Sequence, residues 1–332
     1  MNYVKNIMLA VLCCMLLISC AGQPPADTDI TKVTVVLDWV PNTNHTGMYL
    51  ASDLGYYKQE GLELKIIQPP EDGAVMLVAS GRADFGVSFQ EELAFALTAD
   101  EPLPVTAVAA ILQHNTSGII SLKEKNIQSP KDMQGKVYAT WDAPVEKAIL
   151  KNVIQTDGGD YAKVKMIPTT VTDVAAAIQT DIDAVWVYYG WDGVALEHKE
   201  IATNYFAFKD INPVLDFYTP IIIAGNDFLS NNADIAEKFL YATSKGYEYA
   251  VQNPTEAAQC IVDNVPELDI AIAEKSQDYL SGQYIADAPV WGVIDTNRWA
   301  AFYNWLYDNG LITRQLGEKG FTNKYLPNPT KP

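Results

Sequence analysis

Two hydrophobic patterns alternate along the first two thirds of the chain. Residues 32–38 (KVTVVLD) are rich in β-branched side chains and alternate between polar and apolar positions, which is the period of a half-buried strand. Residues 43–54 instead repeat apolar positions at helical spacing and are stopped by Gly55. The same criteria predict further strands at residues 62–68, 84–89, 105–112, 118–122, 136–141, 164–168, 184–189 and 221–224.

The predicted helices lie between these strands and then dominate the C-terminal third. Such an alternation favours an α/β fold, with parallel-rich sheets covered by helices on both faces. A chain of 332 residues exceeds a typical compact domain, so two such sheets with a cleft between them suit this length. Helices are predicted at residues 71–80, 91–99, 145–155, 171–179, 233–252, 255–262, 269–281 and 297–309.

The N-terminus has the pattern of an export signal. Lys5 precedes an unbroken apolar run at residues 7–18, which is too short to span a bilayer comfortably and suits a signal peptide. The run ends in Leu-Ile-Ser-Cys, which resembles the bacterial lipobox. We therefore expect a lipoprotein signal peptide at residues 1–19, lipidation of Cys20, and a flexible tether at residues 20–31. A plain secretory signal or a membrane anchor is the alternative.

The charge of the chain excludes one class of partner. The chain carries 23 basic and 41 acidic residues, a formal net charge of −18, so it lacks the basic face that nucleic-acid binding requires. Three arginines are present, Arg82, Arg298 and Arg314, and this scarcity weighs against an arginine clamp on a sulfonate or a phosphate.

The cysteines and histidines indicate neither a disulfide nor a metal centre. Cys13 and Cys14 would leave with the signal peptide, and Cys20 would carry lipid. Cys260 is then unpaired, and we expect it to be a buried structural cysteine. The three histidines do not have metal-ligand spacing, so no metal and no cofactor is expected.

Chemically versatile side chains follow five of the predicted strands. Ligands of α/β folds bind outside the carboxyl ends of the strands, close to helix N-termini. The residues at these junctions are aromatic, acidic or amide-bearing, and the junctions contain no lysine or arginine, which suits a flat, neutral or weakly basic heterocycle. The candidate ligand-binding residues are Asp38, Trp39, Asn42, His45, Gln90, Glu91, His114, Asn115, Trp141, Tyr188, Tyr189 and Trp191.

Several of these candidates also have an ordinary structural explanation. Trp39 could belong to the core, and Asn42 could cap the helix that follows it. His45 could be a buried structural histidine with satisfied hydrogen bonds. Gln90 and Glu91 could begin a helix, where acidic residues are favoured in any case.

The three aromatic residues near position 190 cannot all contact one ligand. Neighbouring side chains of a strand point to opposite faces, so Tyr188 and Tyr189 should diverge, with Trp191 beyond them. We expect either Tyr188 or Tyr189 to stack on the ligand ring opposite Trp39, while Asp38 or Glu91 accepts hydrogen bonds from the ring substituents.

Four segments resemble one protein family in their order and spacing. They are the bacterial thiamine-pyrimidine binding proteins (the ThiY-like group) of the thiamine-pyrimidine-synthase-like family, and the resemblance covers roughly residues 32–325. The segments that carry it are LDWVPNTNHTGMYLASDLGYYKQEGL, GRADFGVSFQEELA, ILQHNTSGIISLK and VYYGWDG.

The resemblance implies the two-lobed α/β fold of the type II periplasmic binding proteins, with two hinge crossings. We place the crossings near residues 113–118 and 217–222. The first lobe would then comprise residues 32–115 and 221–325, and the second lobe residues 116–220. Tyr218, which lies at the second crossing, is added to the candidate binding residues.

The resemblance also implies a function in binding. The expected protein is an extracytoplasmic substrate-binding lipoprotein of an ABC importer, anchored to the cell membrane, that captures a thiamine pyrimidine precursor of the formylaminopyrimidine or hydroxymethylpyrimidine type. It would be a monomer whose partners are this small molecule and a membrane permease, without nucleic acid.

An enzyme is not expected, because the sequence has no hydrolase, zinc-protease or nucleotide-binding motif in a suitable context. The stretch FYTPIIIAGNDF also lacks the cysteines that the eukaryotic pyrimidine synthases carry before the second crossing. The alternatives are a binder of another flat heterocycle such as riboflavin, and a pyrimidine-synthase-like enzyme.

Overall fold

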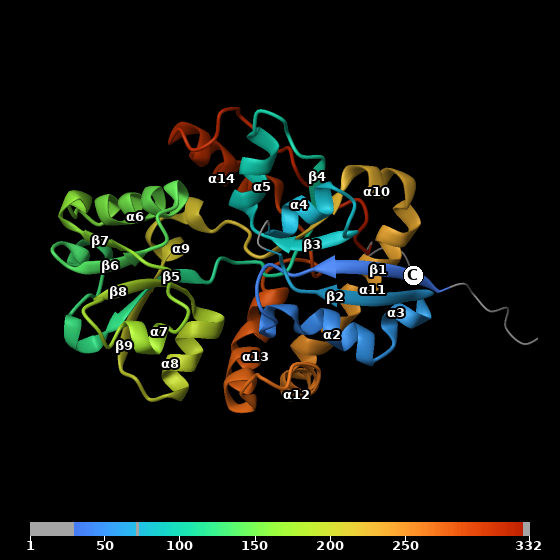
Figure 1. Cartoon of the computed structure of the whole chain (residues 1–332), viewed down its shortest axis with the longest axis horizontal. Coiled ribbons are helices and arrows are strands. Elements are labelled where there is room, and N and C mark those ends of the chain that lie inside the picture. Colours follow the sequence, from blue (N-terminus) through green and yellow to red (C-terminus); the bar gives the residue numbers. More distant parts are fainter. Residues whose placement is uncertain (1–29, 71–72, 328–332) are drawn as a thin grey trace, which may run out of the picture.

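The computed structural model describes residues 30–70 and 73–327, and Figure 1 shows two α/β bodies side by side. The expected signal peptide, the lipidated Cys20 and nearly all of the tether lie outside the described residues. Within the described part of the chain, no helix is both long enough and apolar enough to cross a membrane. The α/β fold that the alternating pattern predicts is confirmed.

The first body contains a five-stranded sheet in the order β2-β1-β3-β10-β4. β1 is parallel to β2 and β3, whereas β10 is antiparallel to β3 and β4. All five residues of β10 are buried, as expected for an apolar strand in the interior of a sheet. The strands are β1 (Thr31–Val36), β2 (Leu62–Ile67), β3 (Phe85–Ser88), β4 (Val105–Ala110) and β10 (Ile221–Gly225).

Helices cover both faces of this sheet. Alternate residues of β1 enter different cores, because Val33 and Val35 pack with α2 and α11, whereas Val36 packs with α4 and α5. The elements are η1 (Thr43–His45), α2 (Thr46–Asp53), α3 (Tyr56–Gln59), α4 (Gly73–Ala79), α5 (Gln90–Thr98), α10 (Asn226–Asn231), α11 (Ala233–Gln252), α12 (Pro254–Asn264), α13 (Ile270–Tyr284) and α14 (Thr296–Asp308).

The second body contains a sheet in the order β7-β6-β8-β5-β9. Its strands are β5 (Ser117–Leu122), β6 (Val137–Thr140), β7 (Lys165–Pro168), β8 (Ala184–Tyr188) and β9 (Thr203–Ala207). Its helical elements are η2 (Lys123–Lys125), η3 (Pro130–Met133), α6 (Pro144–Thr156), η4 (Tyr161–Lys163), α7 (Val174–Ala177), the π-helical turn η5 (Tyr189–Gly193), α8 (Val194–His198), α9 (Phe208–Ile211) and η6 (Pro213–Leu215).

The two sheets share one pairing pattern, although the sequence shows no internal repeat. The second strand in each order, β1 or β6, is parallel to both of its neighbours. The third strand, β3 or β8, also pairs antiparallel with the fourth, β10 or β5, which in turn pairs antiparallel with the fifth. The loops after β1 and β6 therefore occupy corresponding places in the two bodies.

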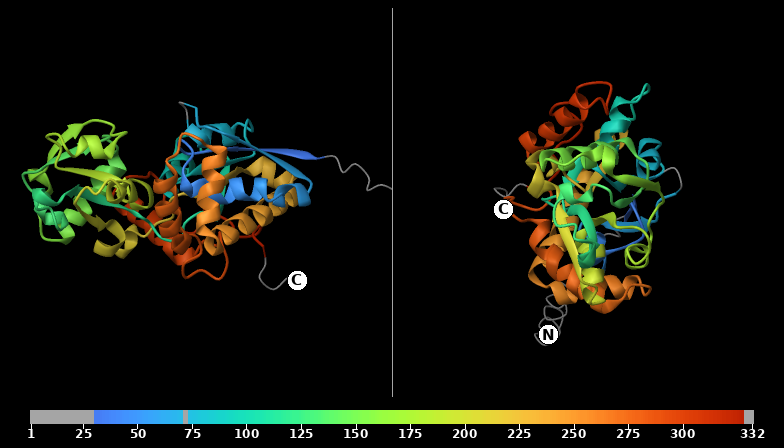
Figure 2. Two further views of the ribbon diagram at one scale, coloured as in Figure 1. Left: turned by 90° about the horizontal axis from the view of Figure 1, so that it is seen from below. Right: turned by 90° about the vertical axis from the view of Figure 1, so that its left-hand side faces the viewer.

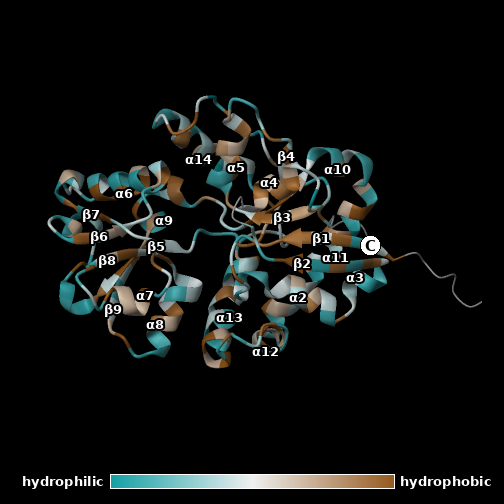
Figure 3. Cartoon of the chain, viewed as in Figure 1, coloured by the Kyte–Doolittle hydropathy of each residue, from teal (hydrophilic) through white to brown (hydrophobic). Residues whose placement is uncertain are grey.

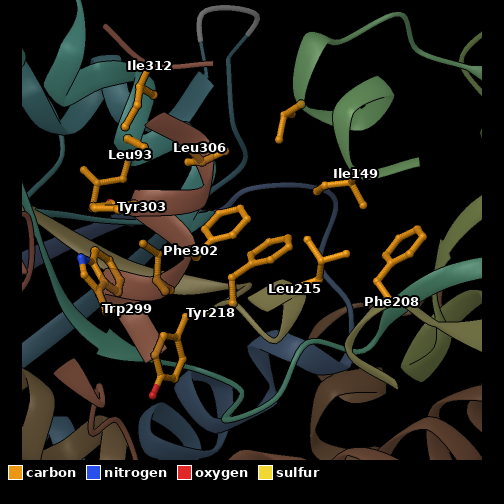
Figure 4. Close-up of a cluster of buried hydrophobic side chains, with 14 of the residues drawn as sticks. Leu93, Ile149, Phe208, Leu215, Tyr218, Trp299, Phe302, Tyr303, Leu306 and Ile312 are labelled. Atoms are coloured by element: carbon orange, nitrogen blue, oxygen red, sulfur yellow. The ribbon is translucent and has the colours of Figure 1, made fainter. Parts of the chain in front are cut away.

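The chain passes from the first sheet to the second between β4 and β5, and it returns between β9 and β10. The apolar core continues beneath the return segment, where Phe217 stacks on Phe302 with ring centroids 4.0 Å apart. Leu215 of the same segment shares a core with Ile149 of α6 and Leu306 of α14, as Figure 4 shows. Figure 2 shows the two bodies from two further sides, and in Figure 3 the strands are more hydrophobic than the outer helices.

Three local predictions are wrong. The strand β9 (TNYFA) was not expected, because it is an edge strand whose first three residues are only partly buried and which therefore lacks a clear apolar pattern. The helix expected at residues 171–179 is limited to α7, since Asp173 caps its start. Cys260 is half-buried rather than buried, and its thiol donates to Asp53 Oδ2 at 3.3 Å.

Candidate ligand-binding site

The pairing of the strands brings the candidate residues to one junction between the two sheets. Because β1 and β3 are parallel, Trp39 and Gln90 leave the same edge of the first sheet. Because β6 and β8 are parallel, Trp141 and Tyr188 leave one edge of the second sheet. These two edges face each other, since Tyr188 lies 6.4 Å from Phe89, the residue after β3, with the rings 15° from parallel.

The loop after β1 is fixed by a buried histidine. His45 is fully buried, and its Nε2 lies 2.7 Å from Asp38 Oδ1. Its Nδ1 accepts a hydrogen bond from the Asn42 N–H at 3.1 Å, so Nε2 carries the hydrogen that is donated to Asp38. The Asn42 side chain in turn accepts from the Asn44 N–H at 2.9 Å. His45 and Asn42 thus form a capping box that orients Asp38.

Trp39 is a surface residue beside this fixed loop. Its side chain is 56% exposed, so the structural alternative that placed it in the core is wrong. An indole left in water at the edge of a sheet, next to an oriented carboxylate, is available to a flat ligand.

α5 begins with Gln90, whose side chain is hydrogen-bonded within the core, and continues with two acidic residues, Glu91 and Glu92. Gln90 is fully buried, and its amide donates to Trp299 O at 3.0 Å and accepts from the Tyr218 N–H at 2.9 Å. Glu91 Oε2 is also buried but has no hydrogen-bond partner among the described residues. Burial raises the pKa of the Glu91 carboxyl to about 8, and the nearby charge of Glu92 acts in the same direction.

Two further acidic groups contribute to the junction, and sequence reasoning missed both as ligand candidates. Glu92 accepts from Ser88 Oγ at 2.5 Å, and burial raises its pKa. Asp192, in the π-helical turn, accepts from the Tyr188 N–H at 3.4 Å, and burial raises its pKa to about 6. Both directly follow residues that had been selected, so their position after a strand was the available signal.

The rings of Tyr188 and Tyr189 have different neighbours, Phe89 for Tyr188 and Tyr205 for Tyr189. The pKa of the Tyr188 phenol is raised by burial and then by the charges of Glu91, Asp38 and Asp192, so this ring lies among the acidic groups. Tyr189 begins the π-helical turn instead of ending the strand, which shortens the strand expected at residues 184–189.

The other candidate aromatic residues of the second body have surroundings of their own. The Tyr189 ring lies 4.6 Å from that of Tyr205 and 5.3 Å from that of Tyr279. Trp191 is half-buried in the π-helical turn. Trp141 is 45% exposed and meets Trp186 edge-on, with centroids 5.1 Å apart.

The candidates on the crossing segments tie those segments together. His114 Nδ1 lies 2.7 Å from Asp216 Oδ2, and this hydrogen bond raises the pKa of His114. The Asn115 N–H donates to Asp216 Oδ1 at 2.9 Å, and its side chain donates to Leu215 O at 2.8 Å. Tyr218 is buried, and its hydroxyl accepts from the Asp295 N–H at 2.8 Å.

An arginine lies beside these strand ends, although the sequence at the junctions contains no lysine or arginine. The Arg298 guanidinium lies 5.2 Å from the Tyr218 ring, and two of its nitrogens lie 3.8 Å from Asp216 and Asp287. It also donates to Gln113 O. The prediction missed it because α14 brings it from the far end of the chain, and these partners already neutralise its charge.

A second contact between the bodies involves α13. Ser276 donates to Gly190 O in the π-helical turn, and its Oγ lies 2.5 Å from Thr43 Oγ1 in the first body. A Cβ added at Gly190 would lie 2.7 Å from Leu280 Cδ2, so a larger residue at this position would force the Leu280 side chain to shift. Across residues 30–70 and 73–327, no group of three or more His, Cys, Asp or Glu side chains is placed to hold a metal ion.

Comparison with solved structures shows to which fold the chain belongs. The chain superposes on the periplasmic aliphatic sulphonate binding protein SsuA from Escherichia coli with a TM-score of 0.67 and 14% identity, over 90% of this chain and 93% of that one. The fold is therefore that of the two-lobed periplasmic solute-binding proteins, as the resemblance implied.

A family model identifies the family of the chain. The model described as NMT1/THI5 like matches residues 42–257, so the chain belongs to the NMT1/THI5-like family. The chain is 29% identical to the formylaminopyrimidine-binding protein of Halalkalibacterium halodurans, over 91% of this chain and 92% of that protein. It is 25% identical to the 4-amino-5-hydroxymethyl-2-methylpyrimidine phosphate synthase of Legionella pneumophila, over 74% of this chain and 77% of that protein.

Proposed function

We propose that the protein is the substrate-binding component of an ABC importer and that it captures an aminopyrimidine precursor of thiamine, of the formylaminopyrimidine or hydroxymethylpyrimidine type. The observation that carries the proposal is the junction of the two sheets, where the Tyr188 ring lies 6.4 Å from that of Phe89 and the charges of Glu91, Asp38 and Asp192 act on the Tyr188 phenol. The facing strand ends also bear the exposed indoles of Trp39 and Trp141. The similarity to a formylaminopyrimidine-binding protein over nearly the whole chain supports this ligand class.

An aminopyrimidine has a flat ring and hydrogen-bond donors, which complement the aromatic and acidic side chains of this junction. Its ring is flat and can stack between Trp39 on one lobe and Tyr188 on the other. Its exocyclic amine donates hydrogen bonds, and Asp38, Glu91 and Asp192 supply acceptors. A protonated Glu91 can also donate to a ring nitrogen, which matches its raised pKa. Closure of the lobes would exclude water and strengthen these hydrogen bonds.

The proposal includes the organisation and location of the protein. Residues 32–115 with 221–325 form one lobe and residues 116–220 the other, with His114, Asn115 and Tyr218 at the hinge. The signal at residues 1–19 directs export, and lipid on Cys20 holds the mature monomer at the outer face of the membrane beside its permease. Stable anchoring requires more than one acyl chain, since a single chain binds weakly and reversibly.

A synthase is the competing function, and the similarity to the Legionella pneumophila enzyme favours it. The two functions differ in what they require. A binding protein holds an unchanged pyrimidine, whereas a synthase of this family would need iron and turnover. Mass spectrometry of small molecules that copurify with the protein separates these functions, and it also detects riboflavin or a sulfonate.

The direct test is calorimetry of the purified mature protein with formylaminopyrimidine, riboflavin and an alkanesulfonate. We expect only the pyrimidine to bind, and Trp39→Ala to weaken its binding by about ten- to a thousandfold through lost stacking and burial. Tyr307→Ala, which removes another exposed aromatic ring, serves as the matched control and should bind normally. Pyrimidine binding that is unchanged by Trp39→Ala, or absent from the unmodified protein, would refute the proposal.

A further inference from the structure

The conformation of the turn that carries Trp141 depends on contacts from outside the turn. Three residues, Trp141, Asp142 and Ala143, connect β6 to α6. Asp142 has a φ of 69°, in the left-handed region, which residues other than glycine adopt only at a cost in free energy. Trp186 touches the Trp141 indole on one edge, while nearly half of the indole surface is exposed. The direction of this side chain therefore depends on how the main chain of the turn is held.

The buried carboxyl group of Glu146 holds the main chain of this turn. Glu146, in the first turn of α6, is fully buried, and its two oxygens accept from Tyr138 Oη at 2.7 Å and from Thr140 Oγ1 at 2.6 Å. Burial raises the pKa of the Glu146 carboxyl, whereas the hydrogen bonds from Thr140 and Tyr138 and from the main-chain N–H groups of Trp141 and Ala143 act in the opposite direction. One side chain thus binds the end of β6, the turn and the start of the helix.

Thr140 extends this network to the strained residue. While its hydroxyl donates to Glu146, the same oxygen accepts from the Asp142 N–H at 2.9 Å. Ala143, at the N-cap of α6, has no side-chain cap, so Glu146 takes over the role of a capping residue from inside the helix. The N-terminus of the helix favours the negative charge at this place.

Burying a carboxyl group in a core costs free energy of folding. An apolar side chain of similar volume in that position usually gives equal or greater stability. What the carboxyl group adds is direction, because two hydroxyl donors from β6 and two main-chain groups of the turn act on the same carboxyl group.

We propose that Glu146 is a positioning residue that fixes the Trp141 indole as the ligand-facing wall of the second lobe. The proposal rests on the proposed function for the identity of the ligand. Glu146 itself does not contact the ligand, and it acts through the turn that it holds. A pre-set indole binds a flat ring more tightly than a mobile one, since its rotational freedom is not lost on binding.

The first test needs no ligand. Trp141 and Trp186 lie close enough for their electronic transitions to couple, which gives a pair of opposite circular-dichroism bands that Trp141→Phe would identify. Glu146→Gln should keep the melting transition cooperative while it abolishes these bands. Thr140→Val should weaken the bands, and Thr140→Ser, which keeps the hydroxyl, should preserve them. Unchanged bands in Glu146→Gln and in Thr140→Val would overturn the proposal.

The second test connects Glu146 to binding. Calorimetry with formylaminopyrimidine should show a loss of affinity of about tenfold in Glu146→Gln, and no further loss when Glu146→Gln is added to Trp141→Ala. Asp183→Asn is the matched control, because Asp183 accepts from the Val137 N–H at 2.8 Å at the other end of the same strand. This control should lower stability but keep both the bands and the affinity.

The two proposals can fail separately. If the unmodified protein does not bind the pyrimidine, the proposed function is wrong. If it binds and Glu146→Gln binds equally well, or if the losses in Glu146→Gln and Trp141→Ala simply add, Glu146 does not act through Trp141 and the inference is wrong. If Glu146→Gln does not fold, Thr140→Val with Thr140→Ser decides by the same two measurements.

Discussion

The loops after β1 and β6 occupy the same place in two sheets of one pairing pattern, and both carry an exposed tryptophan next to an aspartate. In the first lobe the aspartate, Asp38, is buried against His45. In the second lobe the aspartate, Asp142, is 61% exposed and pairs with the surface Lys147. Topology thus sets where the indole stands, while the residues that follow each strand set how firmly it is held.

The side chain that supports the loop also differs between the two lobes. The first loop is held by an aromatic ring from a 3-10 turn, which contacts one carboxylate and one main-chain N–H. The second is held by a carboxyl group from an α-helix, which accepts from two hydroxyl groups and from the main chain. The difference shows that two loops can present the same exposed indole while their stability depends on unrelated residues.

The largest expected effect comes from removing the support of the first loop. His45→Ala leaves the nearly buried Asp38 without its donor and opens a cavity, so the free energy of unfolding should fall by about 3–5 kcal/mol. Urea denaturation measures this loss. His45→Gln, which can still donate to Asp38, should recover part of it. A loss below about 1 kcal/mol in His45→Ala would mean that the buried pair does not hold the loop.

The acidic groups after β3 and β8 provide an intermediate effect that depends on pH. Folding raises the pKa of Glu91 from 4.5 to about 8 and that of Asp192 from 3.8 to about 6. The folded state therefore binds these protons more tightly than the unfolded state. Neither group costs stability below its unfolded pKa, and the cost grows as the pH rises to the folded pKa.

Glu91→Gln should therefore stabilise the unliganded protein by about 1–3 kcal/mol at pH 8 and have no effect near pH 4. The gain from Asp192→Asn should stop growing near pH 6, whereas the gain from Glu91→Gln should continue to grow up to about pH 8. Thermal melts across this pH range compare the two. Identical pH profiles for the two variants would contradict the difference between the lobes.

The smallest effect should come from the surface pair of the second loop. Lys147→Met breaks the ion pair with Asp142, in which both side chains are largely exposed. We expect the melting temperature, the Trp141–Trp186 bands and the pyrimidine affinity to stay the same within error. A clear change in any of the three would show that Asp142 supports its loop as Asp38 does, and the contrast between the lobes would disappear.

The sequence allowed the sheets and most helices to be predicted, because strands such as β1 and β10 have clear apolar patterns. It also placed Trp39, Trp141 and Tyr188 at strand ends that the pairing brings together. The different surroundings of Tyr188 and Tyr189 depend on the π-helical turn, which no local pattern signals.

The supporting residues could not be predicted in this way. Glu146 has the sequence context of an ordinary first-turn acid after a proline, and only its burial against Tyr138 and Thr140 distinguishes it. Arg298 reaches the crossing segments from 82 residues beyond Asp216. Local periodicity reports which face of an element is apolar, but it does not report which distant side chain completes a polar contact.

The position of β10 has a consequence for the order in which the protein is assembled during synthesis and export. β10 lies between β3 and β4, so the first sheet cannot close until residue 225 has emerged, whereas the strands of the second sheet all lie between residues 117 and 207. We expect the second lobe to fold as a contiguous unit while the facing edges of β3 and β4 stay open. Open strand edges are sites of aggregation, so this interval is when the nascent protein most needs a chaperone.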